Sequence, residues 1–249
     1  MPTLPSYEAT LSVPMTCEGC TSEISKALST LPGIQSTSFS IPSKLVTVRG
    51  TDAPSQIIAA IQSTGRAAIL RGSGNPNSAA VCILETPPPM EAPQTPQPSP
   101  VRGLARLIEL GERMTMLDLT LTEMQKGRYR ASVRVSGDIS RGKGSMGGVF
   151  DGLEGDREGK IGELVVDGEG RGSLVGEIGW RVWEMVGRGV VVEKIEDANG
   201  RSKKNQGGGI AIGVIARSAG VWENDKVVCG CSGKTVWEER KEMVERGVS

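Results

Sequence analysis

The 249-residue chain contains no histidine, the side chain that most often binds transition metals in proteins. Aromatic residues make up only 3% of it, so its cores must be mainly aliphatic. Lysine plus arginine and aspartate plus glutamate each number 29, a balance that favours neither nucleic acid nor an acidic membrane surface. There is no apolar run of roughly 18 residues, and Met1 to Pro5 lack the basic start of a secretory signal. We therefore expect a cytoplasmic protein with no membrane span and no nucleic-acid partner.

Cysteine is the remaining residue type that could carry metal or redox chemistry in this chain. Five cysteines form a CxxC pair, a single residue and a CxC pair: Cys17 and Cys20, Cys82, and Cys229 and Cys231. An odd number in this grouping is not typical of the disulfide framework of a secreted protein. It indicates metal binding or redox chemistry.

The CxxC pair lies between a predicted strand at 7–13 and a predicted helix at 20–31. Cys20 is therefore expected near a helix start, where free N–H groups and the helix dipole favour thiolate over thiol. Thiolates are soft ligands that select Cu(I) or Zn(II) over magnesium or calcium.

Three interpretations of the pair remain open on these grounds. A structural zinc site needs four ligands, and the chain offers only three further cysteines and no histidine. A thiol–disulfide redox pair is an alternative, although the aromatic and proline neighbours typical of that motif are absent. A Cu(I) site needs only two thiolates, and this is the interpretation we favour.

Residues 7–72 show the pattern of a small α+β unit. Pro32-Gly33 and Gly65 end its helices, and Pro54 suits the first turn of the second helix. The predicted order is strand 7–13, helix 20–31, strand 34–41, strand 45–49, helix 54–61 and strand 67–70. This βαββαβ order predicts a ferredoxin-like domain.

The segment Val13-Pro-Met-Thr-Cys-Glu-Gly-Cys20 resembles the heavy-metal-associated domains of copper chaperones and copper-pumping ATPases. The resemblance implies that Cys17 and Cys20 bind Cu(I). It also implies that Met15 packs beneath the metal-binding loop and is not a ligand.

The rest of the chain is predicted to be a β domain at 78–222, followed by a flexible tail at 223–249. Residues 86–100 hold seven of the 14 prolines and are predicted to form a loop. Cys82 is expected to be a small buried residue. Short strands and glycine-rich turns predict an antiparallel sandwich or barrel, with strands at 79–84, 101–109, 115–121, 129–135, 163–166, 172–178, 188–194 and 209–217.

This domain resembles the Greek-key barrel of the Cu/Zn superoxide dismutases. The clearest matches are Gly187–Lys194 and Ala211–Ala216, and Tyr129–Asp138 fits the strand that carries copper ligands. The departures from that family are at its functional positions. Ser132 and Arg134 stand where the family has its paired copper histidines, Val192 stands at a third histidine, and Lys160 stands at the zinc-binding aspartate. Gly209 replaces the arginine that guides superoxide, and Ile212 replaces a cysteine of the disulfide. We therefore expect neither dismutase activity nor zinc in this domain.

What the barrel retains is small apolar residues where the dismutases form their homodimer: Val186, Gly187 and Val214. The tail, from Ala216-Arg-Ser-Ala-Gly220 through Cys229-Gly-Cys231 to Trp237-Glu-Glu-Arg240, resembles that of the copper chaperones for Cu/Zn superoxide dismutase. With CxxC, a histidine-free barrel and CxC in this order, the resemblance covers nearly the whole chain.

The resemblance implies a metallochaperone, not an enzyme. Such a protein binds Cu(I), docks on immature Cu/Zn superoxide dismutase as a heterodimer and delivers copper. Cys229 and Cys231 would take part in copper or thiol–disulfide transfer and promote the dismutase disulfide. The alternative is a thiol–disulfide oxidoreductase for a dismutase-like client, with copper incidental. The free protein could be a homodimer, and a fraction could enter the mitochondrial intermembrane space.

Overall fold

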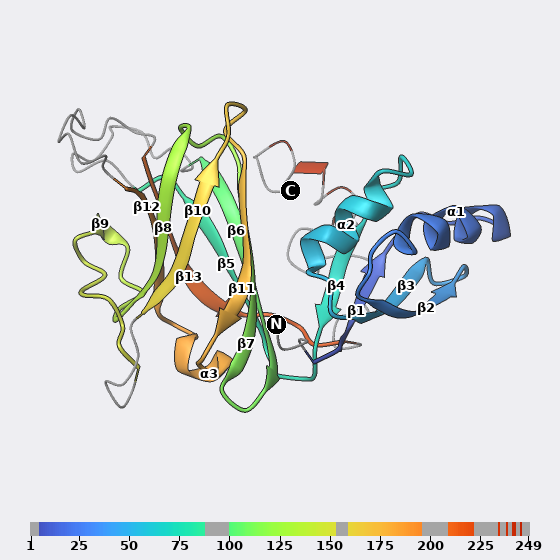
Figure 1. The fold of residues 1–249 in the computed structure, drawn as a ribbon, viewed down its shortest axis with the longest axis horizontal. Helices are drawn as coiled ribbons and strands as arrows, with labels where there is room; N and C mark the ends of the chain where they lie inside the picture. The colour runs from blue at the N-terminus through green and yellow to red at the C-terminus, as the bar shows by residue number, and fades with distance from the viewer. Residues whose placement is uncertain are drawn as a thin grey trace.

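The chain forms a small two-layer domain beside a β-barrel, so the predicted α+β class is confirmed (Figure 1). The structure is a computed structural model that describes residues 5–87, 100–152, 159–195 and 209–221, and in the tail Lys234, Glu238, Lys241, Glu242 and Glu245. Most of the proline-rich loop and of the tail therefore lies outside the described residues. Within the described part, no helix is long and apolar enough to cross a membrane.

The N-terminal domain is ferredoxin-like, as predicted. Its elements are β1 (Tyr7–Ser12), α1 (Glu18–Leu28), β2 (Ile34–Ser40), β3 (Leu45–Gly50), α2 (Pro54–Gln62) and β4 (Ile69–Ser73). The strands pair antiparallel in the order β2-β3-β1-β4. Apolar residues at helical spacing on both helices meet alternate residues of β1 and β3 in one core, which includes Leu11, Ile24, Leu28, Val46, Val48, Ile57 and Ile61.

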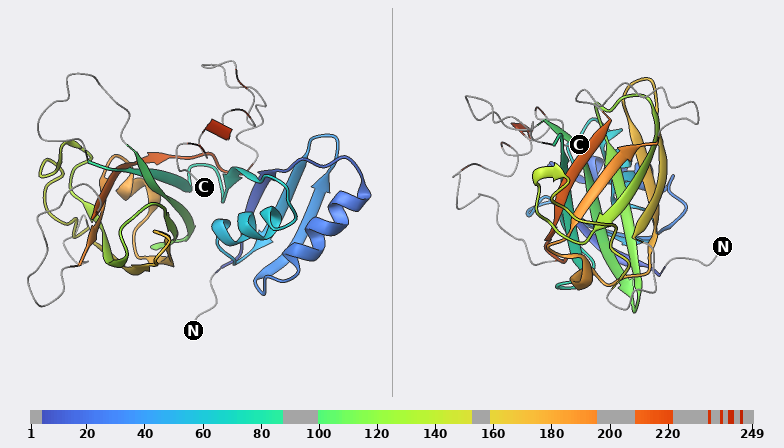
Figure 2. Two further views of the ribbon diagram at one scale, coloured as in Figure 1. Left: turned by 90° about the horizontal axis from the view of Figure 1, so that it is seen from above. Right: turned by 90° about the vertical axis from the view of Figure 1, so that its left-hand side faces the viewer.

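The second domain is an antiparallel barrel, seen from above in the left view of Figure 2. Its elements are β5 (Ala79–Glu85), β6 (Val101–Gly111), β7 (Met114–Leu121), β8 (Gly127–Arg134), β9 (Ser140–Lys143), β10 (Lys160–Val166), β11 (Gly172–Ile178), α3 (Val182–Met185), β12 (Gly189–Lys194) and β13 (Ile210–Arg217). Eight strands pair in the order β10-β8-β12-β13-β5-β6-β7-β11. The outermost strands lie side by side, since a Cβ on Gly162 of β10 would be 3.1 Å from Leu174 of β11. The barrel is thus nearly closed.

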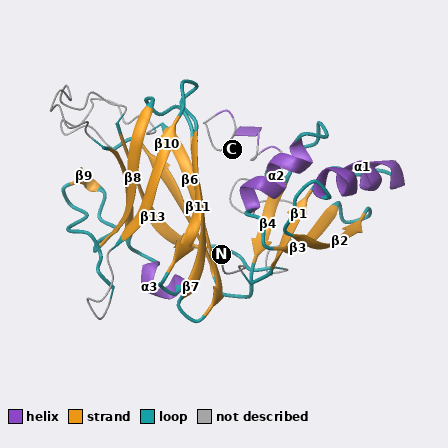
Figure 3. Cartoon of the chain, in the orientation of Figure 1, coloured by secondary structure: helices purple, strands orange, loops and turns teal. Residues whose placement is uncertain are grey.

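Two short elements, α3 and β9, were not predicted (Figure 3). Helix α3 has four residues, too few to show helical periodicity. Its free N–H groups are capped by carboxylates: Arg181 N–H donates to Glu184 Oε2 at 2.8 Å, and Val182 N–H to Glu109 Oε2 at 2.9 Å. The second cap comes from β6, a contact that only the tertiary fold creates.

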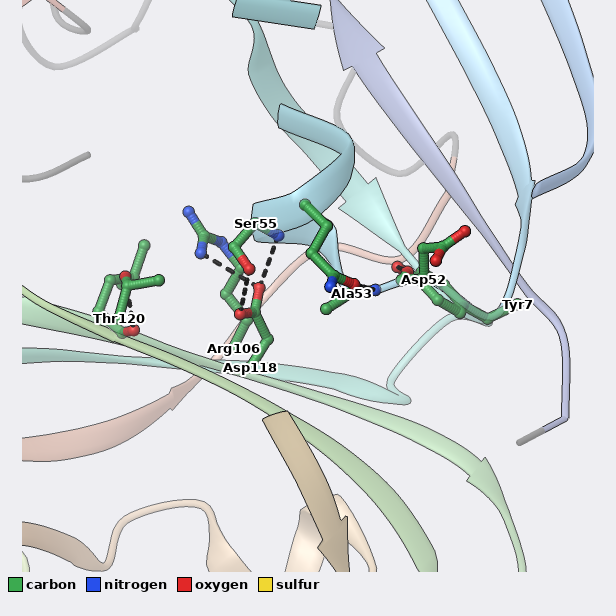
Figure 4. Close-up of polar contacts among 9 residues, drawn as sticks. Tyr7, Asp52, Ala53, Ser55, Arg106, Asp118 and Thr120 are labelled. Carbon is green, nitrogen blue, oxygen red and sulfur yellow. Dashed lines mark hydrogen bonds and ion pairs between the residues drawn. The ribbon is translucent and has the colours of Figure 1, made fainter. Parts of the chain in front are cut away.

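A buried carboxylate joins the two domains (Figure 4). Asp118 on β7 is 1% exposed, and its Oδ2 and Oδ1 accept hydrogen bonds from the Ser55 N–H at 2.8 Å and the Ser55 hydroxyl at 2.6 Å. Ser55 lies in the first turn of α2, where unpaired N–H groups favour an anion. Arg106 on β6 pairs with the same carboxylate at 3.4 Å. Asp118 therefore caps a helix of the other domain.

Apolar and backbone contacts complete this junction. Ile108 and Met116 of the barrel belong to the core of the N-terminal domain. The chain leaving β13 runs along β4, with Ser73 N–H donating to Ala219 C=O at 3.3 Å and Val221 N–H to Gly74 C=O at 3.0 Å. The tail thus begins at the junction between the domains.

Replacing Asp118 by alanine should destabilise the protein more than an exposed substitution does. Asp118→Ala removes the cap of α2 and the carboxylate partner of buried Arg106, so the free energy of unfolding should fall by about 3 kcal/mol. Urea denaturation measures it, with the exposed Asp151→Ala as the control. Equal effects of the two substitutions would contradict this role of Asp118.

Candidate metal centre

The two cysteines of the CxxC motif lie on the turn that joins β1 to α1. Cys17 immediately precedes α1 with extended backbone (φ −156°, ψ 171°) and makes no side-chain cap to the helix. Cys20 is in the first turn, and its N–H donates to Cys17 C=O at 3.1 Å. The strand-to-helix placement predicted for the motif is confirmed.

The sulfur atoms of Cys17 and Cys20 are 3.6 Å apart. A disulfide would bring them to about 2.05 Å, so both are free thiols. Cys17 is exposed and Cys20 partly exposed. With metal–sulfur bonds of about 2.3 Å, the value for zinc thiolates, two sulfurs across one ion would lie roughly 4.6 Å apart. A small side-chain movement at this open turn would accommodate such an ion.

Met15 lies under the turn and not at its surface. It is 1% exposed and belongs to the core of the N-terminal domain. The expectation that it packs beneath the loop is confirmed.

The surroundings of Cys20 favour its thiolate and lower its pKa to about 6. The largest cause is the backbone N–H of Thr16, followed by the Thr16 hydroxyl, whose oxygen is 3.7 Å from Cys20 Sγ, and by the Arg66 guanidinium. Hydrogen bonds to the charged form of an acid stabilise it. Cys20 is therefore a thiolate at neutral pH.

Arg66 is a cationic feature of the site that sequence reasoning missed. It follows α2, and its Nη2 pairs with Glu23 Oε2 of α1 at 2.7 Å, which holds the guanidinium near Cys20. A thiolate pair that binds a monovalent cation keeps a net negative charge, which this guanidinium offsets. Only the packing of α2 against α1 brings Arg66 there, so no local motif could have revealed it.

The other cysteines form no second metal site among the residues that the structure describes. Cys82 is fully buried, as predicted, and burial raises the pKa of its thiol. Cys229 and Cys231 lie outside the described residues. Among the described residues, no three Cys, His, Asp or Glu side chains are grouped as they would be to hold a metal ion.

The barrel positions that match dismutase metal ligands carry an ionic cluster. Ser132 and Arg134 alternate with core residues of β8 and therefore face outward, whereas Val192 lies in the barrel core. Glu193 faces Arg134, with its Oε1 3.4 Å from Arg134 Nη2, and also pairs with Lys143. Val192 therefore does not share a face with Arg134, whereas Glu193 does.

The predicted interface residues are close together. Gly187 (φ +83°) is exposed and follows Val186 after α3, and a Cβ on Gly137 would be 2.4 Å from Gly187 O and 3.0 Å from a methyl group of Val214. The sequence did not single out three more exposed apolar residues on elements next to them. These are Trp183, Val135 and Ile83, at 55%, 52% and 38% exposure.

Comparisons with known proteins agree with this geometry. Residues 10–67 match the heavy-metal-associated domain. The ferredoxin-like domain with its CxxC turn therefore belongs to a class of domains that bind heavy metals. The superoxide dismutase 1 copper chaperone of Debaryomyces hansenii is 40% identical over 259 residues, covering 98% of both chains. That of Saccharomyces cerevisiae is 39% identical over the whole of both chains, and the copper chaperone for superoxide dismutase of Sus scrofa is 33% identical over 92% of this chain and 87% of that protein.

Similarity at this level over nearly the full length shows the family. The chain belongs to the copper chaperones for superoxide dismutase. It is a metallochaperone and not an enzyme.

The pKa of Cys20 can be tested by pH-dependent alkylation. Iodoacetamide reacts with the thiolate, so the alkylation rate of Cys20 should rise with a midpoint near pH 6. Arg66→Met removes a stabilising cation and should move the midpoint upward, whereas the exposed Arg49→Met should not. Peptide mass spectrometry gives both values. A wild-type midpoint near the ordinary value of about 8.5 would contradict the assignment.

Proposed function

We propose that this protein binds Cu(I) through Cys17 and Cys20, docks on immature Cu/Zn superoxide dismutase, and delivers copper to it. The observation that carries the proposal is the exposed pair of sulfurs 3.6 Å apart, one of them a thiolate at neutral pH. Two soft sulfur ligands in a chain without histidine suit Cu(I) better than a harder ion. An exposed turn also allows a third sulfur to enter, so that copper passes by ligand exchange.

The partner binds through a docking face that we define as Ile83, Val135, Trp183, Val186, Gly187 and Val214. Partly exposed apolar groups gathered near one surface are typical of a protein interface, and an exposed tryptophan often dominates its binding energy. The relatives are named for superoxide dismutase, so we propose a heterodimer in which this face replaces the second dismutase subunit. In the absence of client, the same face could form a homodimer.

The tail would connect the metal centre and the client. It leaves the junction at Val221, and an extended stretch of about eight residues reaches roughly 28 Å, far enough to present Cys229 and Cys231 beyond the junction. Tethering raises the effective concentration of a tail cysteine at a docked client to about the millimolar range.

Disulfide transfer by the tail is the second part of the proposal. A client thiolate attacks an oxidised Cys229–Cys231 bond and forms a mixed disulfide, which a second client thiolate resolves. Two client thiols are thereby oxidised to a disulfide, and the tail pair is reduced to two thiols. Oxygen is the oxidant that we propose restores the pair.

A thiol–disulfide oxidoreductase with incidental copper is the alternative. The low pKa of Cys20 favours it, because a thiolate next to a second thiol is also the arrangement of a redox pair. Both functions suit the cytoplasm and the mitochondrial intermembrane space, which are the locations we propose.

Copper delivery can be tested by activating client dismutase. Cu(I)-loaded protein is mixed with reduced, zinc-loaded, copper-free dismutase, oxygen and an excess of Cu(I) chelator, and dismutase activity is measured. Wild type and the buried-cysteine control Cys82→Ala should activate, whereas Cys17→Ser/Cys20→Ser and Cys229→Ser/Cys231→Ser should not. Full activity of Cys17→Ser/Cys20→Ser would favour the oxidoreductase.

Docking can be tested with charged substitutions. Trp183→Glu or Val214→Glu puts a carboxylate in an apolar interface and should weaken heterodimer formation at least about thirtyfold. Val175→Glu is the matched control, because Val175 is 43% exposed but lies on β11, away from the docking face. Titration calorimetry measures the dissociation constants. An equal loss with Val175→Glu would place the interface elsewhere.

A further inference from the structure

The loop after β8 carries part of the docking face. We call residues 135–149 the docking loop; it contains Val135, and a Cβ on its Gly137 would collide with Gly187 and Val214. Its first residues are fixed by backbone hydrogen bonds, with Val135 N–H donating to Gly148 C=O at 3.1 Å and Ser136 N–H to Met146 C=O at 3.0 Å. These bonds close the loop on itself but do not attach its far side to the barrel.

The attachment is made by side chains on the outer face of β8 and β12. Glu193 pairs with Arg134 of β8 and with Lys143 of the docking loop. Arg134 is 7% exposed and its Nε has no partner, so the Arg134 end of the cluster is buried, whereas Glu193 and Lys143 are partly exposed. Arg130 lies opposite Glu193 in the strand register but pairs with Glu163. Lys143 is therefore the loop's own contact with Glu193.

A small group of buried apolar side chains lies beside this ionic cluster. Met146 of the docking loop is fully buried against Val191 and Ile212. Gly189 leaves the space for it, since a Cβ there would be 2.1 Å from Met146 Cε. On the other side, Arg188 donates to Val135 C=O at 2.8 Å and to Glu184 C=O at 2.7 Å, which joins the loop to α3 and the adjacent Val186 and Gly187.

We propose that the Arg134–Glu193–Lys143 cluster is a clamp that holds the docking loop in the conformation that binds the client. The inference rests on the proposed function. The clamp occupies the face where the resembling enzymes bind metal, so side chains alone order the loop. Client binding should then be independent of any metal in the barrel. Arg134, Glu193 and Lys143 are positioning residues, and Lys143 is the one whose loss the fold should tolerate, as its side chain is 41% exposed.

The test combines hydrogen exchange with client binding. Lys143→Met should raise amide exchange in peptides from 135–149 and raise the dissociation constant for copper-free dismutase, each about three- to tenfold, while α1 and α2 exchange as in wild type. Lys143→Arg keeps the charge and should restore both values. The exposed Lys126→Met should change neither. A metal chelator should leave wild-type exchange and binding unaltered.

Several results would overturn the clamp: unchanged loop exchange in Lys143→Met, failure of Lys143→Arg to restore binding, or loop exchange that depends on added zinc or chelator. Failure of the proposed function would give a different result from failure of the clamp. A wild-type chain that does not bind dismutase at all would refute docking, whereas the exchange comparison in the free protein still decides whether the cluster orders the loop.

Discussion

The hydrogen bonds from Ser55 to Asp118 fix the two domains relative to each other. Asp118 places α2 next to the barrel, and α1, which begins at the metal centre, lies on the far side of the N-terminal domain (Figures 1 and 2). The proposed docking face combines residues of β5, α3 and β13 with residues that border β8 and β12. The proposed copper site and the proposed docking face are thus separate, and the tail that we propose connects them follows Val221, at the junction that Asp118 holds together.

The same physical rule explains the chemistry of both domains. Ligand charge and softness decide what a site holds, and at the barrel positions that we expected to match dismutase metal ligands Arg134 pairs with Glu193. The N-terminal turn keeps two sulfurs, and Thr16 and Arg66 stabilise the charge of Cys20. We therefore propose that the cysteines carry the metal chemistry and that the barrel serves as a binding surface.

Local patterns were enough to predict the longer elements, but not the short α3 and β9 or the contacts between elements. Alternation in Val101–Gly111 and helical spacing in Glu18–Leu28 are set by neighbouring residues, so those elements were predicted within a few positions. Arg66, Asp118 and Trp183 depend on packing between distant segments, so the sequence did not mark them. A one-residue shift along a strand exchanges its two faces, so the sequence alone did not show that Glu193, and not Val192, lies beside Arg134.

The central claim is that copper passes directly from this chain to dismutase, and isotope tracing tests it most directly. The protein is loaded with copper-65 and mixed with copper-free dismutase in a buffer containing excess natural-abundance copper bound to a chelator. Native mass spectrometry then gives the isotope in the client. The account predicts dismutase that carries copper-65, formed by way of a one-to-one heterodimer. Dismutase carrying natural-abundance copper, with copper-65 retained on this chain, would contradict it.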